Sequence, residues 1–241
     1  MSALDSYTQM APIYDLVYLF KDYRKEARLI AAVVRKNATA RPRTLLDVAC
    51  GTGAHLEHLR ASFEVEGLDL DRAMLRYARK RLPGVRLHQG DFTRFDLGKQ
   101  YDAVVCLFSA ICHANTIPKL NQAVAAMARH VAPGGVLAIE PWITPQSYVP
   151  GKAGVIQAED DRFRIVRMSF VERTGKRRMR TEFHYLIRSP RRVRYFKESF
   201  ATGLYTDAEY RAAFRRAGLK ARNVGKGPTG RGLYVATKPR P

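Results

Sequence analysis

Hydrophobic and polar positions along the first 142 residues predict short buried strands separated by amphipathic helices. Apolar runs of strand length occur at 44–49, 65–70, 85–88, 101–108 and 136–140. Apolar residues recur with helical spacing at 13–36, 53–61, 73–80 and 120–130. Because strands that alternate with helices form a parallel sheet covered on both faces, we expect an α/β fold with a doubly wound sheet.

Beyond Pro150 the period of the pattern changes from helical to alternating. In 178–187 one set of alternating residues is mostly apolar, namely Met179, Thr181, Phe183, Tyr185 and Ile187. The other set holds Arg180, Glu182 and His184. Side chains two apart in a strand share a face. Together with 163–172 and 193–205, this segment predicts an antiparallel sheet of about three strands.

The last quarter of the chain returns to the first sheet. A helix is predicted at 206–217, and 220–226 and 232–237 flank the turn 227–230 as a hairpin. With this antiparallel hairpin, the main sheet is expected to hold seven mostly parallel strands. We therefore expect one domain over 1–241, with a core at 44–142 that binds a cofactor and an insertion at 150–205 that serves substrate binding or an interface.

The strongest motif is the segment Leu45–Gly53, an apolar strand that enters a glycine turn at the start of a helix. Gly51 and Gly53 let the backbone approach a ligand, and the free N–H groups of a helix start attract a carboxylate. A dinucleotide fold would have a third glycine where Leu56 stands, which argues against NAD. Asp47 before the turn is instead typical of methyltransferases. A simple tight turn is the alternative.

Acidic residues also follow the next two predicted strands. Asp69 is placed to accept hydrogen bonds from both ribose hydroxyls of a nucleoside, and Asp91 to accept the adenine amino group. Leu70 and Phe92 would enclose the adenine ring. One acid at a strand end is weak evidence, but three at consecutive strand ends indicate S-adenosyl-L-methionine as the cofactor.

The charge of the chain favours anionic partners. Lys and Arg number 42 against 22 Asp and Glu, a formal net charge of +20, and the densest basic stretch is 162–197. Nucleic acid, acidic lipid and a phosphorylated small molecule all fit such a field. An arginine-rich composition spread over solvated faces fits as well, and no RNA-binding signature is present, so nucleic acid is not the favoured partner.

Other sequence features indicate a cytoplasmic protein without a membrane partner. No apolar run reaches the length of a membrane span, and Met1–Met10 lacks the basic and apolar regions of a signal peptide. The three cysteines, Cys50, Cys106 and Cys112, lie in apolar segments at spacings unlike those of zinc or haem sites. We expect buried, unreactive thiols and no metal.

The whole chain resembles the N,N-dimethyltransferases that act on TDP-linked amino sugars in macrolide antibiotic pathways, such as those for desosamine or mycaminose. The matching segments are Ile13–Asp15, Lys21–Tyr23, Leu45–Gly53 with His55 and Leu56, Leu82–Pro83, Leu87–Asp91, Phe108–Ser109, Glu140–Trp142 and Gly227–Leu233. The last two are the most specific. The resemblance implies a Rossmann-like class I fold, S-adenosylmethionine-dependent N-methylation of an amino sugar in antibiotic biosynthesis, and allows a homodimer.

The resemblance also implies roles for individual residues. It gives catalytic roles to Tyr14 and His113, and substrate contacts to Tyr14, Trp142, Ser169, Arg180 and Arg231. The two arginines would hold a diphosphate. The implied cofactor site comprises Tyr14, Arg24, Asp47, Ala49, Gly51, Gly53, Asp69, Leu70, Met74, Asp91, Phe92 and Leu107. Structural roles are the alternatives: a buried helix tyrosine, a hydrogen-bonded loop histidine and solvated arginines.

The chemistry of this reaction requires alignment more than a strong base, because the sulfonium methyl group is already activated. We therefore expect His113 to orient the amine rather than to act as an obligatory base. Two positions depart from the family pattern, Ile143 in place of a tryptophan and Cys112 in place of a glycine. The alternatives are an RNA or protein methyltransferase that docks its substrate on 162–197, and a non-catalytic module that only binds the cofactor.

Overall fold

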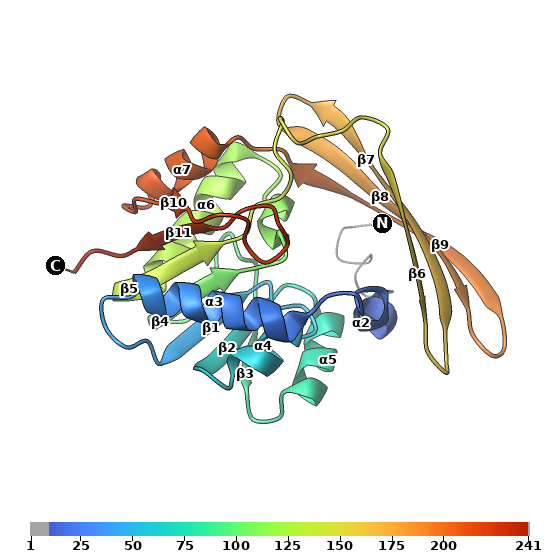
Figure 1. The fold of residues 1–241 in the computed structure, drawn as a ribbon, viewed down its shortest axis with the longest axis horizontal. Helices are drawn as coiled ribbons and strands as arrows, with labels where there is room; N and C mark the ends of the chain where they lie inside the picture. The colour runs from blue at the N-terminus through green and yellow to red at the C-terminus, as the bar shows by residue number, and fades with distance from the viewer. Residues whose placement is uncertain (1–9, 241) are drawn as a thin grey trace.

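The computed structural model describes residues 10–240, which form two β-sheets and the helices around the larger one (Figure 1). The larger sheet has the strand order β10-β11-β5-β4-β1-β2-β3. Its strands are β1 (Thr44–Val48), β2 (Glu64–Asp69), β3 (Arg86–Gln89), β4 (Tyr101–Cys106), β5 (Val131–Ile139), β10 (Arg222–Asn223) and β11 (Tyr234–Thr237). The first five strands run parallel, whereas β11 is antiparallel to β5. The expected Rossmann-like class I fold is confirmed.

Helices cover both faces of this sheet because alternate strand residues are apolar. On one face Leu46 and Val48 pack against α6 (Ile117–Arg129) and α7 (Asp207–Arg216). On the other, Leu45 packs with α3 (Tyr23–Asn37), α4 (Ala54–Leu59) and α5 (Arg72–Arg81). Leu45, Leu46 and Val48 of β1 are fully buried. Truncating such a leucine to alanine costs about 2–5 kcal/mol, so this core fixes the strand ends that carry the site.

The predicted opening helix is broken, which corrects the expectation of one helix over 13–36. A short η1 (Ala11–Ile13) leads into α2 (Tyr14–Val17), and α3 starts only at Tyr23. Asp22 ends the break because its carboxylate accepts the N–H of Lys25 at 2.8 Å and caps α3. The break separates α2 from α3, and α2 lies against the second sheet.

The strand β5 starts at Val131, five residues before the predicted start at 136, and so includes Pro133–Gly135. Gly134 has a φ of +79°, and the pairing of β4 with β5 shifts register between Tyr101 and Ala103. A bulge of this kind accommodates an extra residue in one strand. The remaining predicted elements agree with the structure to within a few residues, although β10 is only two residues long.

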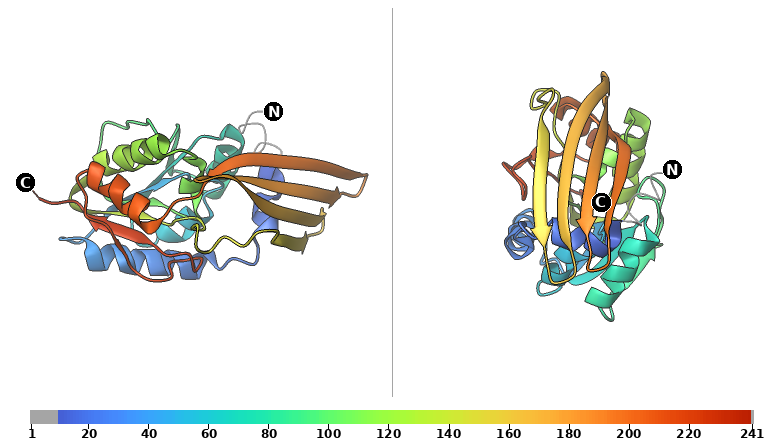
Figure 2. Two further views of the ribbon diagram at one scale, coloured as in Figure 1. Left: turned by 90° about the horizontal axis from the view of Figure 1, so that it is seen from above. Right: turned by 90° about the vertical axis from the view of Figure 1, so that its right-hand side faces the viewer.

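The second sheet has four antiparallel strands where about three were expected. They are β6 (Ala153–Glu159), β7 (Arg164–Gly175), β8 (Arg178–Arg188) and β9 (Val193–Gly203). The sheet projects beyond the end of the larger one (Figure 2). The edge strand β6 was not predicted, because most of its residues are exposed and its alternation is weak.

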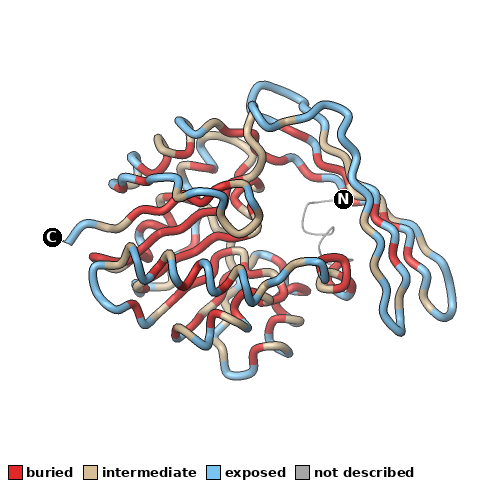
Figure 3. The backbone as a smooth tube through the Cα atoms, viewed as in Figure 1, coloured by how far each residue is buried: buried red, intermediate tan, exposed pale blue. Residues whose placement is uncertain are grey.

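The two faces of the second sheet differ in burial, as the alternation in 178–187 predicts (Figure 3). Met179, Thr181, Tyr185 and Ile187 are buried on the inner face, while Arg178 and Leu186 are exposed. The outer face also exposes five other apolar side chains by more than two fifths, namely Val155, Val166, Met168, Val193 and Tyr195. Self-association through this face would cover them, and the homodimer expected from the sequence stays a prediction.

Two further expectations concern the chain as a whole. The three cysteines are unpaired and buried, as predicted. Within residues 10–240, no helix has the length and hydropathy that a bilayer crossing requires. The proposed division into a core at 44–142 and an insertion at 150–205 stays a prediction, and residues 1–9 and 241 of the expected domain lie outside the described part of the chain.

Candidate active site

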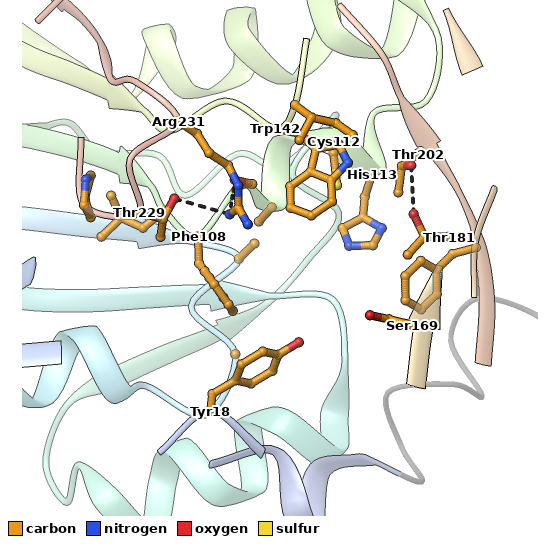
Figure 4. Close-up of a pocket in the computed structure, with 18 of the residues that line it drawn as sticks. Tyr18, Phe108, Cys112, His113, Trp142, Ser169, Thr181, Thr202, Thr229 and Arg231 are labelled. Atoms are coloured by element: carbon orange, nitrogen blue, oxygen red, sulfur yellow. Dashed lines mark hydrogen bonds between the residues drawn. The ribbon is translucent and has the colours of Figure 1, made fainter. Parts of the chain in front are cut away.

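A cavity of about 1270 Å³ lies between the carboxyl ends of the parallel strands and the inner face of the second sheet (Figure 4). Pockets for a single small ligand usually measure about 300–1,000 Å³. The cavity is therefore large enough for a cofactor and a second ligand together. Three non-glycine residues of the described chain have a left-handed backbone, and all three line this cavity: Ala49, Phe108 and Ser109. Strained backbone of this kind is concentrated at functional sites.

Asp69 holds the glycine turn after β1 through hydrogen bonds to backbone N–H groups. Its carboxylate accepts the N–H of Gly51 at 2.7 Å through Oδ2 and that of Asp71 at 2.9 Å through Oδ1. Burial raises the pKa of Asp69, and these backbone N–H groups oppose the rise. Asp69 also lines the cavity, so lone pairs on both oxygens remain for ribose hydroxyls. The structure thus gives Asp69 a loop-holding contact that sequence reasoning did not anticipate.

Most residues expected around the cofactor line the cavity: Tyr14, Ala49, Gly51, Asp69, Leu70, Met74, Asp91, Phe92 and Leu107. Asp91 is oriented by Thr93, whose N–H and hydroxyl donate to its Oδ1 at 2.9 and 2.7 Å. Asp47 and Gly53 do not line the cavity. Asp47 is 2% exposed, and burial raises its pKa. At Gly53 a Cβ would lie 2.7 Å from Leu82, so both residues support the turn from outside the cavity.

The start of α3 contributes to the cavity without Arg24, which the sequence assigned to the cofactor. Arg24 is exposed, whereas Asp22, Lys25, Glu26 and Leu29 line the cavity together with Lys21. Residues three and four apart share a helix face, and Arg24 falls on a different one. The structure therefore does not bring Arg24 to the site.

Lys21 is a cavity residue that sequence reasoning missed. Its side chain is 3% exposed, its Nζ lies 2.7 Å from Glu26, and the same nitrogen lies 4.0 Å from the ring centroid of Phe108. Glu26 also contacts His55 at 2.7 Å, and these partners lower the pKa of Glu26 despite its burial. The segment Lys21–Tyr23 belongs to the family pattern, which was the available signal.

Each of the two expected catalytic residues lies close to an aromatic ring of the cavity wall. Tyr14 lies 4.8 Å from Tyr18 between ring centroids, and His113 lies 5.5 Å from Phe200. His113 comes from η2 (Ala110–His113), which follows the strained turn after β4. Burial lowers the pKa of His113 to about 4. At neutral pH the imidazole is therefore uncharged and suited to exchange hydrogen bonds with a neutral amine.

The inner face of the second sheet presents Ser169 to the cavity, as expected, and also the unexpected Arg167. Arg167 is 6% exposed, donates through Nη1 to the Tyr18 hydroxyl at 2.9 Å, and stacks 4.6 Å from the ring centroid of Phe183. It alternates in phase with Ile165 and Ser169, a signal the sequence already contained. Among residues 10–240, no group accepts a hydrogen bond from its Nε.

Arg180 does not reach the cavity. It lies on the outer face of β8, where it contacts Glu172 at 2.6 Å and Glu182 at 3.5 Å with its side chain half exposed. The alternation of β8 places it opposite to its neighbour Thr181, which is buried and lines the cavity. A strand neighbour of an inward residue points outward, so the diphosphate role implied for Arg180 finds no support here.

Arg231 lies inside the cavity on the loop before β11. Its Nη1 donates to the hydroxyls of Ser109 at 3.2 Å and Thr229 at 3.3 Å, and its guanidinium lies 4.4 Å from the ring centroid of Trp142 (Figure 4). Burial lowers the pKa of Arg231, and Glu140 opposes the shift. Hydroxyls and an aromatic ring hold this cation without neutralising it, so the arrangement is suited to an anion.

Comparisons with known proteins agree with this geometry. A family model described as a methyltransferase domain matches residues 45–135. A dTDP-3-amino-3,4,6-trideoxy-alpha-D-glucopyranose N,N-dimethyltransferase from Streptomyces venezuelae is 43% identical over 229 residues, which cover 93% of this chain and 96% of the relative. A dTDP-4-amino-2,3,4,6-tetradeoxy-D-glucose N,N-dimethyltransferase from Saccharopolyspora spinosa is 38% identical over 95% of this chain and 92% of the relative.

A solved structure supports the same assignment. The S-adenosylmethionine-bound CalS10, an amino pentose methyltransferase of calicheamicin biosynthesis in Micromonospora echinaspora, superposes with a TM-score of 0.85 at 42% identity, covering 94% of this chain and 96% of that one. The chain is thus an S-adenosylmethionine-dependent N-methyltransferase, and the residues around the glycine turn fit that cofactor. It belongs to the class I N,N-dimethyltransferases of nucleotide-linked amino sugars.

Proposed function

We propose that this enzyme methylates the amino group of a TDP-linked amino sugar in antibiotic biosynthesis. The relatives named above act on such sugars. The observation that carries the proposal is Arg231, a cation that lines the same cavity as Asp69. A guanidinium binds phosphate oxygens through two parallel hydrogen bonds, which matches a nucleotide diphosphate.

S-adenosylmethionine supplies an activated methyl group when bound, so this chain's residues have to align and desolvate the amine. Tyr14 and His113 line the cavity and would hold the nitrogen with its lone pair free. His113, with its pKa lowered to about 4, would orient the amine as a neutral hydrogen-bonding group. The proton released on methylation then passes to solvent.

Cationic side chains in the cavity would assist both steps. A positive charge close to an amine disfavours its protonated, unreactive form. Arg167 and Arg231 both line the cavity, and both interact electrostatically with Tyr18. The same charges attract the diphosphate. This accounts for a basic site without invoking nucleic acid.

The direct test is incubation of the enzyme and S-adenosylmethionine with a panel of TDP-linked 3-amino and 4-amino sugars, read by mass spectrometry. We expect one or two added methyl groups on at least one sugar. Arg231→Ala should raise KM for that sugar about 10- to 100-fold while the affinity for S-adenosylmethionine stays nearly unchanged. Arg180→Ala serves as the control, because Arg180 does not line the cavity.

Two outcomes would contradict the proposal. Methylation of RNA or protein with affinity that falls steeply with salt, and no sugar product, would favour the docking alternative. Binding of S-adenosylmethionine without S-adenosylhomocysteine formation on any amine would favour a binding module. Equal weakening of both ligands by Arg231→Ala would instead assign Arg231 a structural role.

A further inference from the structure

Glu140 is the first residue of the most specific family segment, Glu140–Trp142, yet it has no assigned role. It follows β5 directly and is fully buried, and its N–H donates to the carbonyl of Cys106 at 2.9 Å. A buried carboxylate is retained only where hydrogen bonds compensate for its lost hydration. The partners of Glu140 therefore indicate what it is for.

The carboxylate of Glu140 connects three separate segments at the carboxyl edge of the sheet. Its Oε2 accepts the N–H of Phe108 at 2.7 Å, in the turn after β4. Its Oε1 accepts the N–H of Thr229 at 2.8 Å and the Thr229 hydroxyl at 2.5 Å, in the loop before β11. Phe108 and Ser109 have φ values of +51° and +60°, so this bond also helps to hold a strained turn.

These contacts decide which way two hydroxyl groups point. Thr229 gives its proton to Glu140, so its oxygen is left to accept from Nη1 of Arg231 at 3.3 Å. Ser109 gives its proton to the carbonyl of Pro141 at 2.6 Å and likewise accepts from Arg231 at 3.2 Å. Both hydroxyls thus act as acceptors toward the same guanidinium nitrogen.

The segment Glu140–Trp142 therefore supports Arg231 with each of its residues. Glu140 acts through Thr229, Pro141 acts through Ser109, and the Trp142 ring lies against the guanidinium (Figure 4). Within residues 10–240, no carboxylate lies within ion-pair distance of Arg231. Glu140 stabilises the Arg231 cation without contacting it. The N–H groups of the guanidinium therefore remain available to bind an anion.

We propose that Glu140 is a positioning residue, which fixes the hydroxyl of Thr229 and the turn at Phe108 so that Arg231 is held in place for the substrate diphosphate. The proposal rests on the proposed function, because it takes Arg231 as the diphosphate ligand. It predicts a loss of anion affinity without a comparable loss of cofactor affinity when the Glu140 network is cut.

Calorimetry with thymidine diphosphate as the probe tests this, with S-adenosylmethionine affinity measured alongside. Thr229→Val removes the hydroxyl and should weaken thymidine diphosphate about tenfold, while Thr229→Ser should restore it. Glu140→Gln should weaken it at least as much, because an amide nitrogen cannot accept from Phe108 or Thr229. With the sugar substrate, both weakening variants should raise KM far more than they lower kcat.

Thr44→Val is the matched control, because its hydroxyl also donates to a carboxylate, that of Asp102 at 3.1 Å, at the opposite end of β1. It should leave thymidine diphosphate affinity unchanged. If Arg231→Ala has no effect on that affinity, the proposed role of Arg231 fails. If Arg231→Ala weakens it but Thr229→Val and Glu140→Gln do not, the positioning role of Glu140 is overturned. Should Glu140→Gln fail to fold, Thr229→Val against Thr229→Ser decides alone.

Discussion

The two walls of the cavity are built on different structural principles. The wall at the carboxyl ends of the parallel strands uses tight backbone turns and carboxylates, with Asp69 at the end of β2 and Asp91 two residues after β3. The wall formed by the second sheet uses alternate side chains of long antiparallel strands, among them Arg167 and Ser169 of β7. The first wall offers acceptors to a nucleoside, and the second offers a cation and aromatic rings.

Because of this difference, the two walls respond differently to a shift in strand register. A residue at a strand end keeps its place as long as the strand forms, because the sheet fixes all carboxyl ends at one edge. Whether a side chain within a long strand reaches the cavity depends on the face that it occupies. If the strand shifts its register by one residue, a side chain that faced the cavity faces solvent instead. A carboxyl group buried on the second wall without enough local stabilisation is instead protonated at neutral pH, as the raised pKa of Glu198 indicates.

The largest expected effect concerns Glu198, which is buried on β9 opposite Phe183. Burial raises the pKa of Glu198 to about 8, although a hydrogen bond from Tyr185 and the positive charge of Arg167 oppose the rise. Its folded-state pKa exceeds its unfolded value of about 4.5, so the folded protein loses stability as the pH rises from about 4.5 to about 8. At pH 7 this amounts to about 3 kcal/mol.

Glu198→Gln should therefore unfold at higher urea concentration than the parent protein at pH 7.5, with much less difference at pH 5. Urea unfolding at both pH values measures this directly. A difference in unfolding free energy that is the same at both pH values would show that Glu198 is ionised in the folded protein. The second wall would then hold a buried carboxylate as the first wall does.

The next effect tests the first wall. Asp69→Ala should weaken S-adenosylmethionine by about 1.5 to 3 kcal/mol, the scale of hydrogen bonds to a charged group. Because Asp69 also holds the N–H of Gly51 at 2.7 Å, part of this loss comes from the glycine turn. Asp69→Asn keeps one acceptor and should lose less. Calorimetry that finds unchanged affinity for Asp69→Ala would remove this residue from the cofactor site.

Sequence reasoning predicted the first wall more completely than the second, for a physical reason. Asp69 and Asp91 line the cavity because each lies at or shortly after the end of a predicted strand, and their contacts to the cofactor stay predictions. The resemblance assigned Arg180 to the substrate site. However, Arg180 is next to Thr181 in β8, and because Thr181 is buried on the inner face, Arg180 lies on the outer one. Lys21 could not be placed because a single continuous helix was predicted where Asp22 starts a new one.

The remaining differences arise from contacts that are distant in sequence. The network of Glu140 joins residues 89 positions apart, from Glu140 to Thr229. No local pattern specifies such a pairing, and the resemblance only marked the two segments as characteristic. The edge strand β6 was missed because solvent covers most of its residues and weakens the alternation. The local sequence pattern thus predicts strands and the faces of their side chains. The hydrogen-bond network of Glu140 could be recognised only from the folded structure.

His113 lies where the two walls meet, and its replacement separates orientation from base catalysis. With its pKa lowered to about 4, His113 is neutral at the pH where an amine becomes reactive. His113→Asn should therefore lose only about tenfold in kcat, about 1.4 kcal/mol, and the acidic limb of the pH profile should persist because the substrate amine sets it. A loss of roughly 10² to 10⁴ together with a flat profile below neutral pH would make His113 the base.

The smallest expected effect is that of replacing Arg180. It tests most directly whether only the inner face of the second sheet binds substrate. Arg180 is half exposed and paired with Glu172 at 2.6 Å, and exposed ion pairs contribute about 0 to 1 kcal/mol. Arg180→Ala should therefore change KM for the sugar nucleotide by no more than about twofold, whereas Arg167→Ala, on the inner face of the same sheet, should raise it more. If Arg180→Ala raises KM as strongly as Arg231→Ala does, the substrate must contact the outer face of β8. In that case the second sheet binds substrate with residues of both faces, and burial in the free enzyme does not identify its binding side chains.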